Sequence, residues 1–476
     1  MRQSTLRFEL VGSAVAVGAL GATICFNALP GLNWALWTAL VATELTIFAW
    51  PRLGANRATF AVTIAFAVVL GVAAAITANP ASLTLICMAV ALLLAVAARL
   101  AAGVPAPLFG TAEFFRTPFL ATIDAIREAF ARIESFVSAV LSEVHAKIGV
   151  GIAIALPVVV VFSVLLSGAD PTLASWLRVI PRLFSDWSWF SRLLFFGLLA
   201  LLSLGTFGLA AGGLTKRITA ENAAGPRFVL GDTERRIVVG AVDALFALFL
   251  VLQAFNPQTK GQSYTEYVHN GFAQLTIVAT LSAILVAVLH NGRPRVGTPW
   301  GTLALLGQCE LLVASALHRI VIYQRDYGYT ALRIWVTAYM LLVAGLLALA
   351  AYEVARPALI DVRRFVRRGA LLATTTLTVM VYGNPDAWVA QLELHRYQTT
   401  GKANISSLAD LSADALPTLV TIAKTLPASC TSGLQLGIGP HRHWYEWSAR
   451  EARARRALEG FSPMMNPLGE CPVAPW

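Results

Sequence analysis

Two short stretches gather residue types that could bind an anion. The stretch "SALHRIVIYQRDYGYTALRIW" at 315–335 places three arginines and three tyrosines between two apolar segments, and "YTEYVHNGF" lies upstream at 264–272. An arginine guanidinium offers a fork of hydrogen-bond donors that fits a phosphate or a carboxylate. The candidate polar cluster comprises Tyr264, Glu266, Tyr267, His269, His318, Arg319, Tyr323, Arg325, Asp326, Tyr327 and Arg333.

Two interpretations of this cluster remain open. In one, it is a ligand site in which Glu266 or Asp326 orients the arginines around a bound anion. In the other, the charges form ion pairs that pin neighbouring helices to the C-terminal tail, since charged residues kept at a membrane boundary usually have a partner. The tyrosines also fit an aromatic belt at the lipid headgroups.

Isolated polar residues within apolar runs form a second candidate set. They are Glu44, Asp243, Gln308 and Glu310. A charge at membrane depth is costly, so each marks either a transport pathway or a bond between helices. No broken helix or paired half-repeat is visible, and the sequence therefore favours bonds between helices over a transporter's proton site.

Metal and catalytic motifs are not found. His441, His443 and Glu446 lie close together in "HRHWYE", but no further ligand completes a zinc set. The sequence contains no P-loop, dinucleotide-binding glycine motif, HExxH or GxSxG. We therefore predict no metal site and no cofactor, and no catalytic residue can be named.

The elements that position these residues are long apolar segments. Of the 476 residues 57% are hydrophobic and only 13% are charged, against about 25% in a soluble domain. Runs near twenty residues long are typical of helices that cross a bilayer. We predict an all-α, polytopic transmembrane helical bundle of about eleven spans, at 10–29, 32–50, 58–78, 82–102, 148–167, 190–213, 236–256, 271–290, 299–321, 331–353 and 369–383.

Four regions follow from this pattern: N-terminal transmembrane helices at 1–110, a cytoplasmic amphipathic helix at 111–147, a core bundle at 148–383 and a small, mostly helical extramembrane tail at 384–476. In the tail, Ser412 is a candidate N-cap for a helix from residue 413, and a basic helix should stop at Gly460.

The positive charge of the chain predicts its orientation. Lysines and arginines concentrate in the loops that face the cytoplasm if the N-terminus is inside, as in proteins of the bacterial inner membrane. We therefore interpret the net charge of +10 as a topology signal and not as a nucleic-acid surface. If 369–383 crosses the membrane the tail is extracytoplasmic, and Cys430 and Cys471 then form a disulfide; otherwise they are free thiols.

A heptad pattern marks the amphipathic segment. Apolar residues recur at steps of four and three, at Phe119, Ile123, Ile126, Phe130, Ile133, Val137, Val140 and Val144. The pattern would suit a dimerising coiled coil or a cytoplasmic coupling helix. It suits better an amphipathic helix that lies along the membrane interface or on the bundle itself, because phenylalanines in a short seam specify a partner poorly.

Three stretches together resemble a family of bacterial multi-pass membrane proteins known only as a domain of unknown function, of the 4153/4173 type. They are "YTEYVHNGF", "SALHRIVIYQRDYGYTALR", and a later run with Asn384, Arg396, Gly401, Lys402 and "LSADALP". His269 and Asn270 stand where the family has basic residues, and Ser407 where an aromatic is usual. The resemblance covers roughly 150–430 and implies a membrane location but no activity.

Three classes of function therefore stay in view. The first is a structural, signalling or partner-binding envelope component, whose tail or 112–147 helix binds another protein. The second is a transporter or flippase-like protein that uses the intramembrane acids. The third is an enzyme acting on a lipid-linked substrate at the polar cluster. We favour the first, because the sequence contains no catalytic motif; besides the lipid bilayer and an envelope protein no partner is predicted.

Overall fold

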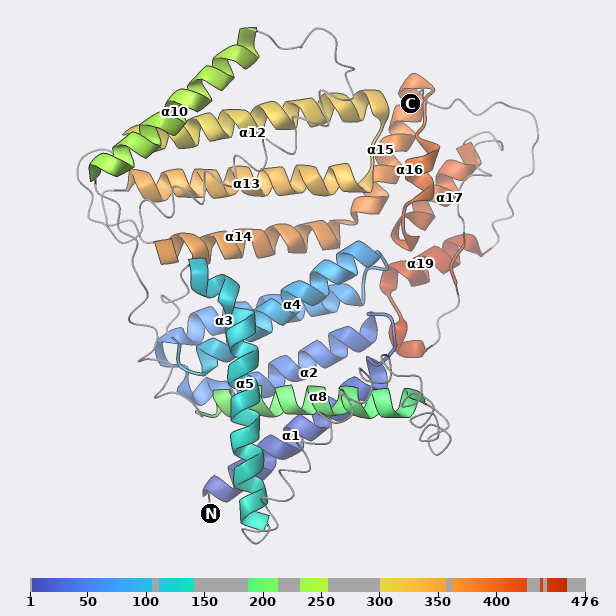
Figure 1. Cartoon of the computed structure of the whole chain (residues 1–476). Coiled ribbons are helices and arrows are strands. Elements are labelled where there is room, and N and C mark those ends of the chain that lie inside the picture. The colour runs from blue at the N-terminus through green and yellow to red at the C-terminus, as the bar shows by residue number, and fades with distance from the viewer. Residues whose placement is uncertain are drawn as a thin grey trace, which may run out of the picture.

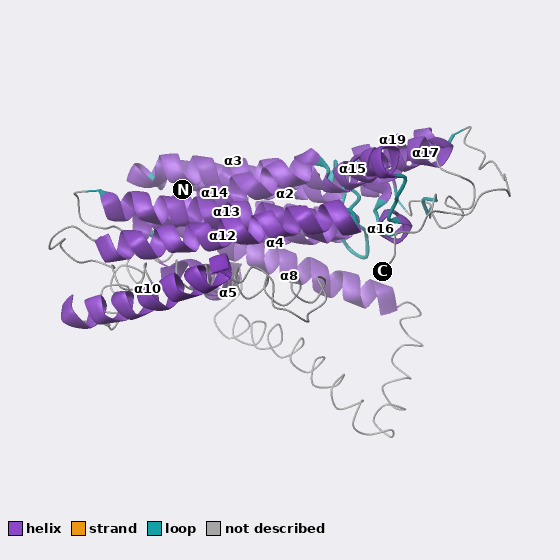
Figure 2. Ribbon diagram, turned by 90° about the horizontal axis from the view of Figure 1, so that it is seen from above, coloured by secondary structure: helices purple, strands orange, loops and turns teal. Residues whose placement is uncertain are grey.

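The computed structural model describes residues 2–104, 111–140, 187–212, 232–255, 300–356, 362–425, 437–439 and 443–459. The regular elements of these ranges are all helices, as the sequence predicts. Figures 1 and 2 show long helices side by side in a stack, with the short helices of the tail gathered along one end of it. We call this the tail end of the stack.

One part of the stack comes from the first third of the chain together with a later helix. It contains α1 (Arg2–Ile24), α2 (Leu32–Ala49), α3 (Arg57–Ala74), α4 (Pro80–Ala101) and α8 (Trp187–Ala210). These helices share a core of buried side chains that includes Leu10, Leu45, Phe60, Leu100 and Phe207. We refer to them as the N-terminal helix group.

The C-terminal helix group is built from α10 (Asp232–Phe255), α12 (Trp300–Tyr327), α13 (Ala331–Ala355) and α14 (Val362–Gly383). Its core includes Phe246, Leu305, Leu312, Met340 and Leu347. In Figure 1, α14 lies between α13 and the α3–α4 pair, and its buried Val381 packs with Leu70 and Ile86 of those two helices. The two helix groups therefore meet at α14.

Six helices in the described part of the chain are long and apolar enough to cross a membrane. They lie at Leu32–Arg52, Gly54–Ala74, Pro80–Ala101, Ser191–Ala210, Trp300–Tyr327 and Ala331–Ala355. Three further predicted spans, 10–29, 236–256 and 369–383, correspond to α1, α10 and α14, which are helical but not among these six. The predicted spans 148–167 and 271–290 lie outside the described residues.

The polar stretch at 315–335 is more helical than its composition suggests. The predicted span ended at residue 321, whereas α12 continues to Tyr327. No proline or glycine lies between residues 315 and 327, and the helix ends at Gly328, where φ is +89°. Thr330 then caps α13 by accepting a hydrogen bond from the backbone N–H of Arg333 at 3.3 Å. Only a short turn separates the two helices.

The amphipathic helix α5 (Thr111–Val140) crosses the other helices at a steep angle in Figure 1 and packs on α4 and α8. The face that touches the stack carries Ala121, Ala125 and Ala129, all buried. The heptad residues Phe119 and Phe130 remain 71% and 40% exposed. Only part of the apolar seam docks: Ile133 packs against the core of the N-terminal helix group, whereas the closest approach of the two backbones is at the small residues Ala125 and Gly205.

The tail begins at Asn384, whose left-handed conformation (φ +62°) breaks the chain direction between α14 and α15. Its elements are α15 (Pro385–Thr400), α16 (Ile405–Ala409), η5 (Ala413–Ala415), α17 (Leu416–Thr425), η6 (Trp444–Glu446) and α19 (Ala449–Leu458). Ser412 is the N-cap of η5, as predicted, and accepts from the Asp414 N–H at 3.3 Å. A small core of its own includes Leu408, Leu416, Leu419 and Ile422.

Candidate functional site

The predicted polar cluster divides into exposed residues and residues that pack together. Arg325 and Asp326 are exposed in the last turn of α12, and His318 is exposed more than two turns earlier on the same helix. By contrast, the rings of Tyr323 and Tyr327 stack at 4.7 Å between centroids. Arg319 is half-buried on the same helix, and Tyr264, Glu266, Tyr267 and His269 lie outside the described residues.

Arg333 is the cluster arginine whose contacts are clearest. Its guanidinium lies 4.4 Å from the ring centroid of Tyr323, in a cation–π arrangement. The same side chain donates a hydrogen bond to the backbone carbonyl of Gly328. The guanidinium of Arg333 is therefore used to hold the turn between α12 and α13.

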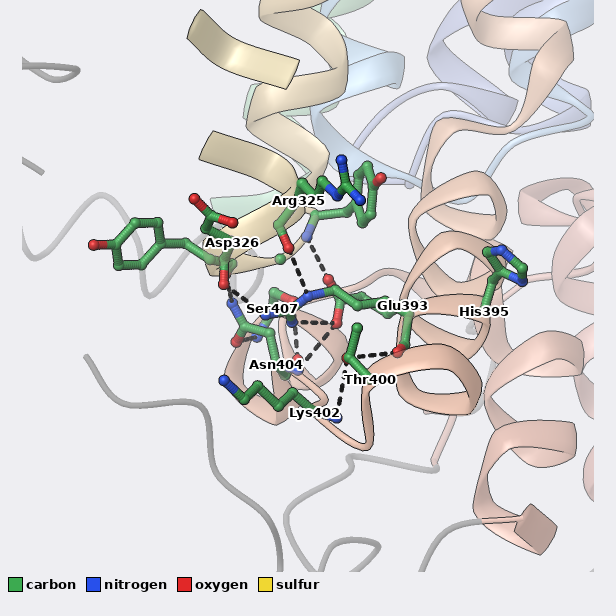
Figure 3. A network of polar contacts seen from close by, with 12 residues as sticks. Arg325, Asp326, Glu393, His395, Thr400, Lys402, Asn404 and Ser407 are labelled. Atoms are coloured by element: carbon green, nitrogen blue, oxygen red, sulfur yellow. Dashed lines mark hydrogen bonds and ion pairs between the residues drawn. The ribbon is translucent and has the colours of Figure 1, made fainter. Parts of the chain in front are cut away.

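Two charged residues of α15 complete this region, and we call them, with Asn404, the α12–α13 clamp (Figure 3). The Arg396 guanidinium donates from Nη2 to the Asp326 carbonyl at 2.8 Å and from Nε to the Arg325 carbonyl at 3.3 Å. Both acceptors belong to the last turn of α12, whose carbonyls have no partner within the helix. Arg396 thus caps the C-terminus of α12.

Glu393 is fully buried beside Arg396 and contacts its Nη1 at 3.4 Å. One carboxylate oxygen accepts from the backbone N–H of Tyr329, and the other accepts from the N–H of Asn404 at 3.0 Å. Asn404 in turn donates to the Tyr327 carbonyl at 3.3 Å. These bonds place groups from the tail directly against the α12–α13 turn (Figure 3).

A second clamp joins the tail to the loop between α3 and α4 and to the end of α14. Asp414 accepts from the Thr77 hydroxyl and from the Ala78 N–H, the latter at 2.6 Å, and pairs with Arg450 at 3.0 Å. Arg450 also donates to the carbonyls of Val381 and Tyr382 at 2.9 and 2.8 Å. We call this set the Asp414 clamp.

Burial raises the pKa of the Asp414 carboxyl above its ordinary value, although the bonds from Thr77, Ala78 and Arg450 all favour the ionised form. A second acid, Asp386, supports the same loop. Its carboxylate accepts from the Asn79 side-chain amide at 2.8 Å and from the Ser412 N–H at 3.1 Å. Two buried acids of the tail therefore hold the residues that connect α3 to α4.

The third contact reaches the loop between α1 and α2. The Leu32 N–H donates to the Trp447 carbonyl at 3.0 Å, and the Leu29 N–H donates to Glu446 Oε1 at 3.4 Å. A Cβ added to Gly31 would lie 2.6 Å from the Glu446 carbonyl oxygen, so only glycine permits this approach. Glu446 also accepts from the His443 N–H, which makes it a local cap.

Metal-ligating residues do not gather in the described part of the chain: no group of three or more histidine, cysteine, aspartate or glutamate side chains is close enough to hold an ion. His441, Cys430 and Cys471 lie outside the described residues, so the disulfide stays a prediction.

The predicted intramembrane polar residues are not brought together. Glu44 is half-buried on α2, in the N-terminal helix group. Asp243 lies on α10, close to Gly301 of α12, while Gln308 and Glu310 follow further along α12. The described residues therefore place one acid in the first helix group and the others in the second.

The principal contacts of the tail were missing from the sequence-based candidates. Glu393, Asp386 and Arg450 had not been selected, while Arg396 and Asp414 (the aspartate of "LSADALP") entered only through a family resemblance. A usable signal was the Glu–x–x–Arg spacing at 393–396, which places the two charges side by side on a helix. The acceptors of Arg396 are backbone carbonyls, which no sequence pattern reveals.

Comparison with known proteins adds a family but no activity. No curated protein and no solved structure matches the chain. The profile of one family, described as a domain of unknown function (DUF4153), matches residues 64–422. This range includes α12, α13, α14, the α12–α13 clamp and Asp414. A match over most of the length of the chain places the protein in the DUF4153 family.

Proposed function

We propose that this protein is a multi-pass component of the bacterial inner membrane, with its N-terminus in the cytoplasm and its tail outside. Its role is structural or signalling: the docked tail presents a surface to an envelope partner. This proposal is supported by the apolar helices and by the way the tail attaches to them.

The observation that carries the proposal is the set of bonds that the buried charged residues of the tail make to the helix ends and loops. Glu393 and Arg396 bond to the α12–α13 turn, while Asp414 and Arg450 bond to the α3–α4 loop and to α14. The tail thus bridges both helix groups at one end of the stack (Figure 1). Charges committed to backbone partners in this way serve attachment and leave little capacity to bind a substrate.

The transporter and enzyme alternatives receive less support. A transporter needs a continuous polar route, yet Glu44 and Asp243 lie in different helix groups. An enzyme at the polar cluster needs convergent side chains around a cleft, yet Arg333 and Arg396 point their guanidinium groups at backbone carbonyls of the α12–α13 region.

In-cell photocrosslinking from chosen positions tests the proposed role. A photoreactive amino acid at Lys424, exposed on α17, should give a discrete protein adduct that excess unlabelled chain competes away. The matched control is Leu341, 58% exposed on the apolar helix α13, which should give no discrete adduct. If several exposed positions of the tail, Lys424 among them, crosslink no better than Leu341, the partner-binding role is wrong.

A further inference from the structure

The tail carries two exposed tryptophans in one short segment. Trp444 is 72% exposed and Trp447 is 42% exposed, on either side of the buried Glu446. The ring of Tyr445 lies between them in sequence and stacks with His443 at 4.9 Å between centroids. The segment 443–447 therefore turns its carboxylate inward and its aromatic rings outward, which is unusual for a segment facing only water.

The position of this segment along the stack is fixed by backbone bonds. The Trp447 carbonyl accepts from the N–H of Leu32, which is the first residue of both α2 and the candidate span Leu32–Arg52. Gly31 touches the backbone of Glu446 and Trp447. Both tryptophans consequently lie at the level where an apolar helix ends, and not out on the far side of the tail.

Exposed apolar side chains also lie in the loop that contacts this segment and in the first turn of α2. Leu29, in the loop that Glu446 caps, is 69% exposed, and Leu36, one turn into α2, is 45% exposed. Exposed leucines on a helix of this hydropathy face lipid when the helix spans a membrane. The tryptophan segment therefore extends a lipid-facing surface beyond the helix end.

The other end of α2 shows the same chemistry. Trp50 is 44% exposed, and the guanidinium of Arg57 lies 5.5 Å from its ring centroid. Tyr352, near the C-terminal end of α13, is 49% exposed, and the guanidinium of Arg356 lies 4.8 Å from its ring centroid. The 18 residues of α2 span about 27 Å at 1.5 Å per residue, close to the thickness of a bilayer's hydrocarbon core.

We propose that residues 443–447 form a membrane-interface anchor, with the indoles of Trp444 and Trp447 in the lipid headgroup layer. An indole has an apolar body and one N–H donor, and such rings concentrate where hydrocarbon meets water. The anchor holds the tail against the bilayer surface as well as against the helix loops. It requires that the helices cross the membrane but is independent of any protein partner.

Depth-dependent fluorescence quenching in a bilayer tests the anchor. The full-length protein carries a fluorescent amino acid in place of Trp444, in nanodiscs of phosphatidylethanolamine and phosphatidylglycerol. Nitroxide quenchers are placed on the headgroup, high on the acyl chain or near its end. The matched control carries the same fluorophore at Lys424, exposed on α17 at the far side of the tail.

The headgroup and shallow quenchers should quench the fluorophore at 444 several-fold more than the deep quencher does, and should barely affect the one at 424. Equal quenching at both positions overturns the anchor. Protection of the fluorophore at 444 from quenching that appears only when cell extract is added also overturns the anchor, since it would show that a protein, and not lipid, covers this position.

A stability comparison gives a second readout. The double variant Trp444→Ser, Trp447→Ser should lower the unfolding temperature in nanodiscs more than in detergent, because only a bilayer offers a headgroup layer. An equal loss in both media means that the rings act through packing alone and contradicts the anchor.

Discussion

At the scale of single residues, the main feature is a set of buried charges that bond to backbone groups of distant loops. Arg396 and Glu393 are 6% and 0% exposed and lie within one turn of α15. A buried ion pair contributes modestly as a pair, but removing one member leaves an uncompensated charge and is strongly destabilising. The two residues are therefore sensitive points for tail attachment.

Replacing Arg396 by Gln should destabilise the protein by about 3–5 kcal/mol, because Glu393 loses its cation and two carbonyls of α12 lose their donor. The measurement is reversible unfolding in detergent. Arg325→Gln is the matched control, because the exposed Arg325 side chain lies outside the clamp and its carbonyl is kept. Equal losses in the two variants would contradict the described role of Arg396.

Asp414 and Arg450 should behave as a coupled pair. Each of the variants Asp414→Asn and Arg450→Gln leaves the other charged group without its partner. The free energy of unfolding of the double variant should therefore fall by about 1–3 kcal/mol less than the sum of the losses in the two single variants. The unfolding free energy of the four proteins in the cycle gives this coupling. Asp410→Asn, at an exposed acid nearby, combined with Arg450→Gln should be additive. If the losses of unfolding free energy in Asp414→Asn and Arg450→Gln were additive, the pair would make no specific contribution to stability.

At the scale of elements, the close packing of α5 on α8 depends on one glycine. A Cβ on Gly205 would lie 1.8 Å from the carbonyl oxygen of Ala125, so the two backbones are in direct contact. Arg132 strengthens this crossing by donating to the Gly208 carbonyl at 3.1 Å and pairing with Glu128. Small residues on both helices make the crossing possible.

The variant Gly205→Ala should therefore displace α5 from α8. We expect faster amide hydrogen exchange across 111–140 and a lower unfolding temperature. The control is Gly197→Ala on the same helix, where an added Cβ meets nothing within 4 Å and alanine favours the helix. Unchanged exchange in α5 after the Gly205 substitution would show that the contact is not required for docking.

The elements could be predicted from the sequence to different degrees. Helix formation followed from long apolar runs, and the cap at Ser412 followed from its residue type. The predicted span ended at residue 321 and did not indicate that α12 continues to Tyr327, although the polar residues before Gly328 are compatible with a helix. That α5 can pack on the bundle was predicted, but the part played by Ala121, Ala125 and Ala129 in this contact was not, because hydrophobic periodicity highlights large apolar residues.

The candidate site was predicted in part, and the reason is physical. Tyr323, Tyr327 and Arg333 do pack together, because one short turn joins their helices. The partners from the tail could not be predicted, because Arg396 meets Asp326 across a separation of 70 residues and does so through a backbone carbonyl. Such a contact depends on the folded path of the chain and not on any local pattern.

At the scale of the whole molecule, the loops that the tail is seen to contact in the described ranges lie at one end of the stack. They join α1 to α2, α3 to α4 and α12 to α13. Arg57 and Arg99, in contrast, lie at the other end of α3 and α4. This distribution supports the proposed orientation, in which the basic loops stay in the cytoplasm.

Cysteine labelling should therefore distinguish the two ends. In a cysteine-free background, Lys424→Cys should react with a membrane-impermeant maleimide in intact spheroplasts, and Arg57→Cys should react only after permeabilisation. Both positions are exposed, so accessibility within the protein is matched. The reverse pattern would place the tail in the cytoplasm and would also remove the expected Cys430–Cys471 disulfide.

The three-way attachment of the tail also has a consequence for the order of assembly. Glu446 contacts a loop 417 residues earlier in the chain, and Asp414 contacts one 336 residues earlier. The tail is synthesised after these helices, so it can dock only once the α1–α2, α3–α4 and α12–α13 hairpins lie next to one another. If the helices cross a membrane as proposed, a docked tail indicates that all three hairpins are inserted, and a chain with one misinserted hairpin would have an undocked tail that is more open to proteolysis.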